Sequence, residues 1–140
     1  MTEKNFKFRQ IHMDFHTGGE IPGIGSQFAA EEFADTLKEA SVNSVTCFAR
    51  GHHGWLYYDS DKFPERIHPN LKNKHLLKEQ IEACHKNDIN VPIYITVQWD
   101  LYTAQKHPEL WTLNEDGKPL GNYSLYEAGF YRNLCVNTPY

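Results

Sequence analysis

Residues 91–97 read Val-Pro-Ile-Tyr-Ile-Thr-Val, and this stretch decides the predicted fold class of the 140-residue chain. Apolar and β-branched residues fill it almost completely, which is typical of a strand buried on both faces of a parallel sheet. Two further strands are predicted upstream, over residues 10–15 and 42–48. The chain is therefore expected to contribute three strands to a sheet.

Helical patterns fill the two intervals between these strands. Apolar residues recur at helical spacing over residues 27–40, and Ser26 is a suitable N-cap for that helix. A second helix is expected over residues 73–87. The order strand, helix, strand, helix, strand predicts an α/β fold with a parallel sheet and right-handed crossovers. Residues 49–72 are expected to form a long, aromatic-rich loop, and neither a further helix nor a fourth strand is expected after Leu101.

Length and composition narrow the function classes. A chain of this length suits one domain, residues 1–140. The net charge of −4 comes without a basic tract, so nucleic acid is not expected as a partner, and no long apolar run predicts a membrane span. The cysteines lie far apart and the first residues contain no apolar leader, so we expect no structural zinc site and a cytoplasmic location. No glycine-rich nucleotide motif occurs, so no cofactor is expected.

Ionisable and aromatic residues follow each predicted strand. They are His16 after the first strand, His52, His53 and Trp55 after the second, and Trp99 and Asp100 after the third. The carboxyl ends of parallel strands meet at one edge of a sheet, so we expect these side chains to come together there. The opposite strand ends carry ordinary turn residues. This asymmetry predicts a functional site at the carboxyl edge.

Each of these residues also has a structural interpretation. His16 could be satisfied by a backbone group, and Trp99 could close the end of the sheet. Asp100 could pair with a lysine or cap a helix. His52 and His53 are consecutive, so their side chains point apart and one of them alone could face a cleft.

Three motifs carry a resemblance to a known family. Residues 49–60, Ala-Arg-Gly-His-His-Gly-Trp-Leu-Tyr-Tyr-Asp-Ser, resemble the double-histidine loop of α-L-fucosidase-type glycoside hydrolases. Residues 14–18, Asp-Phe-His-Thr-Gly, are similar to their first-strand motif, and residues 93–99 are similar to their third strand, which ends near a tryptophan. More broadly, the whole chain resembles the N-terminal segment of bacterial hypothetical glycosyl hydrolases. In that group the segment precedes the rest of a (β/α)8 barrel and often a β-galactosidase-type trimerisation domain.

The resemblance implies a fold, an activity and a set of binding residues. The fold is a (β/α)8 barrel, of which this chain supplies three βα units at most, because a complete barrel needs about 250 residues. The activity is hydrolysis of O-glycosidic bonds in carbohydrates, α-L-fucosidase-like or β-galactosidase-like. By resemblance His16, His52 and His53 would hydrogen-bond sugar hydroxyls and Trp99 would line the ring. Trp55 and Asp100 complete the expected substrate-binding set.

Two departures from the fucosidase pattern bear on the chemistry. Gly54 and Trp55 stand where fucosidases have aspartate and phenylalanine. The fucosidase nucleophile is an aspartate at the end of the fourth strand, and the acid/base lies later still, so neither position falls within this chain. Most glycosidases need both carboxyl groups. No catalytic residue is therefore assigned, and the isolated chain is predicted to be inactive.

Two alternatives stay open at this point. A metal-dependent hydrolase or isomerase on the same barrel could use Asp14, His16 and His52 as ligands, since carboxylates and imidazoles are suitable donors. A non-catalytic sugar-binding or assembly subunit is the other. Three open strands would expose unpaired edges, which favours a homo-oligomer or a longer protein as the context of the chain.

Overall fold

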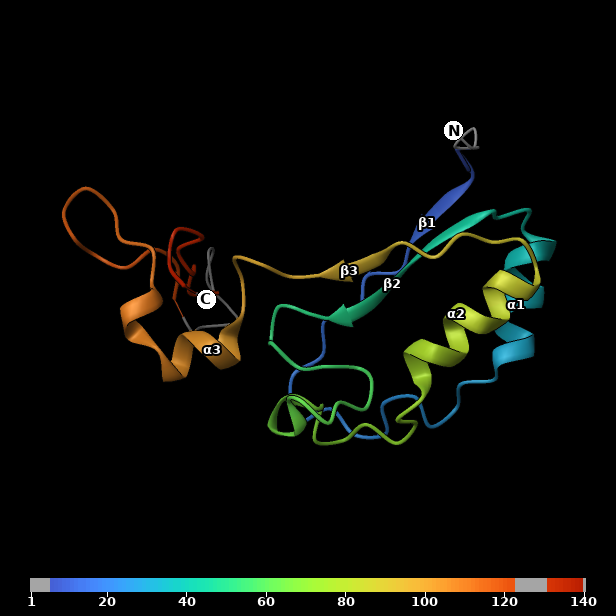
Figure 1. The fold of residues 1–140 in the computed structure, drawn as a ribbon, viewed down its shortest axis with the longest axis horizontal. Helices are drawn as coiled ribbons and strands as arrows, with labels where there is room; N and C mark the ends of the chain where they lie inside the picture. The colour runs from blue at the N-terminus through green and yellow to red at the C-terminus, as the bar shows by residue number, and fades with distance from the viewer. Residues whose placement is uncertain (1–5, 123–130, 140) are drawn as a thin grey trace.

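The structure is a computed structural model that describes residues 6–122 and 131–139. Within these ranges one parallel sheet is accompanied by α-helices and short 3-10 turns (Figure 1). The elements are β1 (Gln10–His12), α1 (Ala30–Glu39), β2 (Ser44–Arg50), η1 (Pro64–Arg66), α2 (Leu76–Lys86), β3 (Ile93–Ile95), α3 (Leu101–Lys106) and η2 (Pro108–Leu110).

The predicted α/β order and the parallel sheet are confirmed. The strands lie in the order β1-β2-β3, and both neighbouring pairs run parallel. The pairing of β2 with β3 shifts by one residue between Phe48 and Arg50. Because β2 alone has a neighbour on each side, it is the strand that the sheet buries, and both outer strands are largely exposed.

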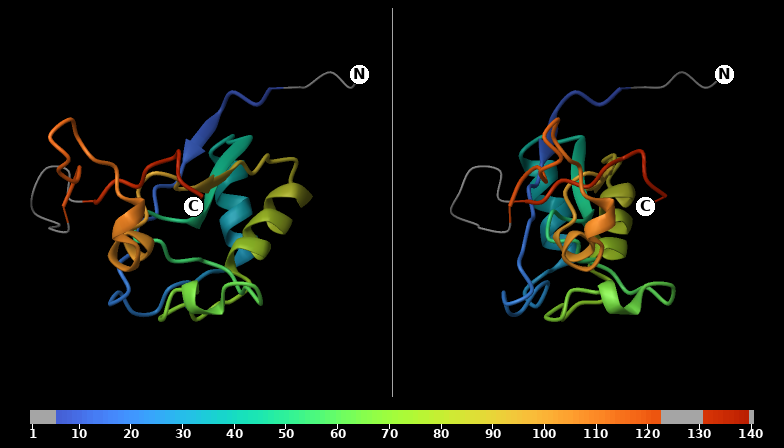
Figure 2. Two further views of the ribbon diagram at one scale, coloured as in Figure 1. Left: turned by 60° about the vertical axis from the view of Figure 1, so that its left-hand side comes forward. Right: turned by 90° about the vertical axis from the view of Figure 1, so that its left-hand side faces the viewer.

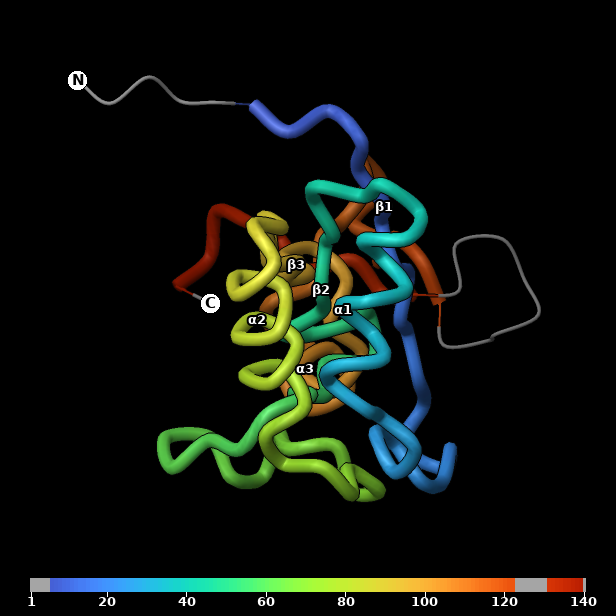
Figure 3. Tube along the Cα trace, turned by 90° about the vertical axis from the view of Figure 1, so that its right-hand side faces the viewer, coloured from blue at the N-terminus to red at the C-terminus, as the bar shows by residue number. Residues whose placement is uncertain are grey.

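Helices α1 and α2 cover one face of the sheet. Alternate residues of β2, namely Val45, Cys47 and Ala49, pack in one apolar core with side chains of both helices, among them Leu37 and Leu77. Figure 3 shows the two helices side by side in front of the strands. The other face of β2 therefore carries Thr46 and Phe48, and Phe48 belongs to a second apolar core with Tyr57 and Leu76.

The helix and strand starts differ from the predicted ones for local reasons. Ser26 does not cap α1, because Gly23 and Gly25 adopt positive φ angles of 72° and 73° and place Ser26 in a preceding turn. The helix begins four residues later, after Ala29. Likewise β2 begins at Ser44 because Val42 still donates its N–H to Leu37, in the motif that ends α1.

The prediction that residues 91–97 are buried on both faces is wrong for this structure. Ile93, Ile95 and Val97 are 41%, 54% and 59% exposed. Strand β3 pairs with β2 along one edge, and no described residue pairs with its other edge as a strand. An apolar strand can be buried on both faces only where further elements pack over it, and the described residues supply none there.

The helix α3 is absent from the sequence prediction, which places no helix after Leu101. Its six residues are too few for a periodic pattern to be recognised, and Asp100 supplies the cap that starts it. After α3 the chain turns back, and Leu134 donates its N–H to the carbonyl of Gln98. Figure 2 shows this returning segment in red, beside α3. None of the described helices has the length and apolar character needed to cross a bilayer.

Candidate functional site

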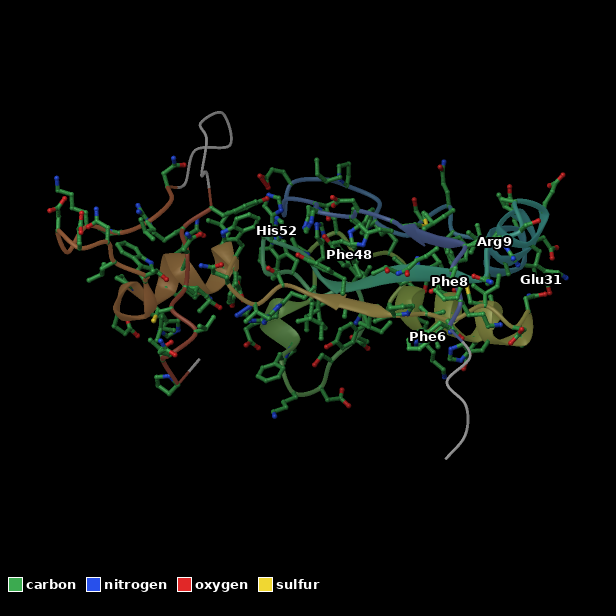
Figure 4. The ribbon with its side chains drawn as sticks, turned by 90° about the horizontal axis from the view of Figure 1, so that it is seen from above. Phe6, Phe8, Arg9, Glu31, Phe48 and His52 are labelled. Atoms are coloured by element: carbon green, nitrogen blue, oxygen red, sulfur yellow. The ribbon has the colours of Figure 1, made fainter. Side chains whose placement is uncertain are left out.

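The carboxyl ends of all three strands meet in one group of aromatic and imidazole side chains. We call His16, His52, His53, Tyr94, Trp99 and Tyr131 the imidazole cluster. The rings of His16 and His52 stack with their centroids 3.6 Å apart, and Trp99 stands edge-on to His52 at 4.8 Å. Figure 4 places His52 beyond Phe48, toward the end of the sheet that carries α3. The three strand ends thus converge as the parallel topology predicts.

Both ring nitrogens of His16 are engaged within the protein. The backbone N–H of His52 donates to His16 Nδ1 at 2.9 Å, and His16 Nε2 lies 3.0 Å from Asp14 Oδ1. Because a backbone N–H can only donate, Nδ1 must be unprotonated and the neutral ring carries its proton on Nε2, toward Asp14. Burial lowers the pKa of His16, although Asp14 partly opposes the shift. His16 therefore anchors the backbone of His52.

His52 is the centre of the cluster. Its Nε2 lies 2.9 Å from the hydroxyl of Tyr94, a residue of β3. Burial first, and then the neighbouring His16, lower the pKa of His52 to about 4. At neutral pH this imidazole is uncharged, with one donor and one acceptor nitrogen, which suits hydrogen bonding to hydroxyl groups.

His53 points to a different part of the cluster. The hydroxyl of Tyr131 lies 3.3 Å from His53 Nδ1, and the two rings are perpendicular. Tyr131 also stands edge-on to His52 and lies beside Trp99, and burial raises its pKa to about 12. The consecutive histidines thus diverge, but Tyr131 contacts both.

Tyr94 and Tyr131 are site residues that sequence reasoning missed. Tyr94 lies at the centre of the predicted strand 91–97, so reasoning from the residues that follow each strand could not find it. Tyr131 follows a segment that the sequence could not place in any element. The chain reaches the cluster there because Trp99 Nε1 donates to Asn133 Oδ1 and the backbones of these residues form a bridge.

Trp55 is not brought into the cluster. Its ring packs perpendicular to Tyr102 at 5.2 Å and near His68 at 6.1 Å. On its other side lies Gly19, where an added Cβ would come within 3.3 Å of the indole. The ring contacts of Trp55 are therefore with residues outside the imidazole cluster, and its predicted contact with a sugar stays a prediction.

Asp100 lies under the loop instead of at its exposed face. It is 0% exposed, and its Oδ1 accepts the N–H of Thr103 at 2.9 Å, which caps α3. Its Oδ2 accepts a hydrogen bond from Arg66 at 2.8 Å, and Arg50 lies 3.4 Å away. Of the two structural interpretations of Asp100, the helix cap is confirmed. The ion pair also exists, but its partners are arginines and not a lysine.

The described residues offer no ligand set for the alternative of a metal-dependent enzyme. Within residues 6–122 and 131–139, no three histidine, cysteine, aspartate or glutamate side chains converge so that they could hold a metal ion.

Comparison with known proteins gives matches to a family model and to solved structures. Residues 29–140 match the family model described as hypothetical glycosyl hydrolase 6. The solved structure of α-L-fucosidase isoenzyme 2 from Paenibacillus thiaminolyticus is 40% identical over 96% of this chain, with a TM-score of 0.84. A hypothetical protein from Ruminiclostridium thermocellum is 17% identical over 90% of this chain and 60% of its own, with a TM-score of 0.56, which shows a shared fold.

The match covers nearly all of this chain but a small part of the fucosidase. The chain spans only 20% of that protein's length. No curated protein sequence matches the chain. The similarity therefore supports a partial fucosidase-like barrel of three parallel strands, at the N-terminal end of a glycosyl hydrolase.

Proposed function

The chain belongs to the hypothetical glycosyl hydrolase 6 family, and we propose that it supplies the sugar-binding part of a (β/α)8 glycoside hydrolase. The imidazole cluster at the carboxyl ends of three parallel strands is the observation that carries the proposal. Barrel enzymes place their substrates at this edge. The family and the fucosidase neighbour indicate that the ligand is a carbohydrate.

The side chains of the cluster fit the two chemical surfaces of a pyranose. Trp99 is 42% exposed and offers an aromatic face to the C–H groups of a sugar ring. The Nε2 of His52 lies at the hydroxyl of Tyr94, and this imidazole, neutral at physiological pH, offers its Nδ1 to the sugar hydroxyls. A few placed polar groups on an aromatic surface are the usual make-up of a small-molecule site.

Binding without cleavage is what we propose for this chain alone. Glycoside hydrolysis needs two carboxyl groups, about 5–5.5 Å apart in retaining enzymes and further apart in inverting ones. The imidazole cluster contains no carboxylate, and Asp14, which contacts it, is hydrogen-bonded to His16. We propose that the nucleophile and the acid/base come from further βα units of a complete barrel.

A binding titration tests this function. Methyl α-L-fucoside and methyl β-D-galactoside would be added to the ¹⁵N-labelled chain, with the imidazole signals observed. We expect saturable shifts at His52 with a Kd on the order of 1 mM, which corresponds to about −4 kcal/mol. His52→Ala and Trp99→Ala should each weaken binding at least tenfold, about 1.4 kcal/mol.

The control is His85→Ala, which removes an exposed histidine of α2 and should leave binding unchanged. The absence of saturable binding by every glycoside in the panel would refute the proposal. Release of nitrophenol from aryl glycosides by the pure chain would refute the separate claim that it lacks the catalytic carboxylates.

A further inference from the structure

Three consecutive backbone carbonyls of the double-histidine loop, those of residues 52–54, accept hydrogen bonds from α3 and Arg66. The N–H groups of Leu101 and Tyr102 donate to the carbonyls of His52 and His53, at 2.9 Å and 3.2 Å. The carbonyl of Gly54 accepts a hydrogen bond from Arg66 at 3.1 Å. The side chains of His52 and His53 contact Tyr94, Trp99 and Tyr131. The geometry of both imidazoles therefore depends on α3 and Arg66.

Asp100 connects these two supports. One carboxylate oxygen caps the first turn of α3, and so holds the N–H groups that bind the loop. The other oxygen accepts a hydrogen bond from the same Arg66 nitrogen that reaches Gly54. Arg66 also donates to the hydroxyl of Thr103 and lies over the ring of Tyr102, 4.7 Å from its centroid. A buried carboxylate with paired charges and satisfied oxygens is a rigid support.

Gly54 shows how closely the loop and the carboxylate approach. Its φ angle is +86°, and an added Cβ would lie 2.2 Å from Asp100 Oδ1 and 2.8 Å from Tyr102 Cβ. The carboxylate thus occupies the space that a side chain at this position would need. The position of the Asp100 carboxylate therefore requires a residue without a side chain at position 54.

We propose that Asp100, acting through Arg66 and the first turn of α3, is the positioning residue that holds His52 and His53 in place for a sugar. Its burial means that Asp100 acts through the loop and does not touch the ligand. The functional meaning rests on the proposed sugar site, but the positioning itself can be measured without any sugar.

The test is an NMR titration of the imidazoles in Asp100→Asn, compared with the unaltered chain. Asparagine can still cap Thr103 through its oxygen, but its NH2 group opposes the Arg66 donor. In the unaltered chain His52 should titrate near pH 4, since burial lowers its pKa to about that value. If the loop loosens, His52 gains water, and we expect its pKa in Asp100→Asn to rise by at least one unit.

The sign of the shift separates positioning from a simple charge effect. Loss of a nearby negative charge would lower the pKa of an imidazole, because the imidazolium loses a favourable partner. A rise in a variant whose backbone amide signals in β2 and α2 are unchanged supports positioning. An unchanged or lowered pKa of His52 in folded Asp100→Asn would overturn the proposal.

Two further variants keep the test decisive. Asp35→Asn removes an exposed carboxylate of α1 and should leave His52 unaltered. If Asp100→Asn does not fold, Arg66→Lys answers the same question, because one ammonium cannot reproduce the fork that bonds Asp100, Gly54 and Thr103 together. A rise in the pKa of His52 there supports the proposal, and no change refutes it. If the unaltered chain binds no glycoside but the pKa of His52 rises in these variants, the proposed sugar binding is refuted and the positioning role of Asp100 is supported.

Discussion

The helix-covered face of the sheet and its carboxyl edge are built on different principles. Between β2 and the helices, apolar side chains exclude water, and burial there raises the pKa of Cys47 to about 12. At the carboxyl edge, neutral imidazoles and phenols are half-buried and hydrogen-bonded to one another. The first region obtains its stability from burying area, whereas the second obtains its geometry from satisfied polar groups. The apolar core that stabilises the fold is thus a different region from the carboxyl edge that could bind a ligand.

Truncation in the helix-covered core should have the largest effect. Leu77→Ala removes a buried side chain of α2 from the core around Val45, and we expect the free energy of unfolding to fall by about 2–5 kcal/mol. Urea unfolding followed by circular dichroism measures this. Leu113→Ala is the control, because Leu113 is 55% exposed and its loss should cost no more than about 0.5 kcal/mol. Equal losses in the two variants would contradict this assignment of the core.

A methyl group at Gly54 should have the next largest effect. Gly54→Ala combines a positive φ with a Cβ that meets the buried Asp100 carboxylate, so we expect a loss of about 2–4 kcal/mol. Gly117 has a similar φ of +74° but nothing within 4 Å of an added Cβ. Gly117→Ala should therefore cost only the backbone strain, about 1–2 kcal/mol. Thermal unfolding of the pair isolates the contact with Asp100, and equal costs would show that it does not matter.

The carboxyl edge should make stability depend on pH. Burial lowers the pKa of His52 to about 4 in the folded state, against an ordinary value of 6.5. The unfolded chain therefore binds this proton first as pH falls, and the folded state loses stability between about pH 6.5 and pH 4. Because the side chain is partly solvated, we expect a loss of about 1 kcal/mol after screening.

Substitution of His52 isolates that contribution from the carboxylates, which titrate nearby. The difference in unfolding free energy between pH 7 and pH 4 should be smaller in His52→Gln than in the unaltered chain. His85→Gln, on the exposed face of α2, should keep the original difference. A pH dependence that is identical in His52→Gln and the unaltered chain would show that this imidazole is not desolvated.

The open edge strand should give the smallest change in stability. Ile95 is 54% exposed on β3, so Ile95→Lys should alter the free energy of unfolding by no more than about 0.5 kcal/mol. A charge on an edge strand opposes pairing with another chain. If the chain forms homo-oligomers, sedimentation should therefore show fewer of them in Ile95→Lys. A large loss of stability in the monomer would mean that β3 is covered in solution.

Much of the fold could be predicted because its signals are local. Apolar residues at helical spacing place α1 and α2, and a short apolar run places β2, each to within a few residues, and the order of these elements predicts the parallel sheet. The boundaries were wrong where turn chemistry intervenes, as at Gly23 and Gly25 before α1. Helix α3 was missed because six residues do not establish a period.

The candidate site could be predicted in part, for the same reason. Parallel topology was enough to bring His16, His52 and Trp99 to one edge. It could not show that His16 has both nitrogens engaged, that Trp55 packs against Tyr102, or that Tyr131 joins the histidines. These facts depend on which way each side chain leaves the backbone, and on a segment whose path has no periodic signal.

Local signals in the sequence are enough to predict the order of the elements, the parallel direction of the strands and the imidazole and indole side chains at their carboxyl ends. Periodicity and strand direction follow from neighbours along the chain. Long-range packing brings Asp100 to Arg66, 34 residues away, and Tyr131 to His53, across 78 residues. The same packing leaves β3 exposed. Such contacts depend on how distant segments share space, because a buried charge takes whichever partner the packed chain brings within hydrogen-bonding distance.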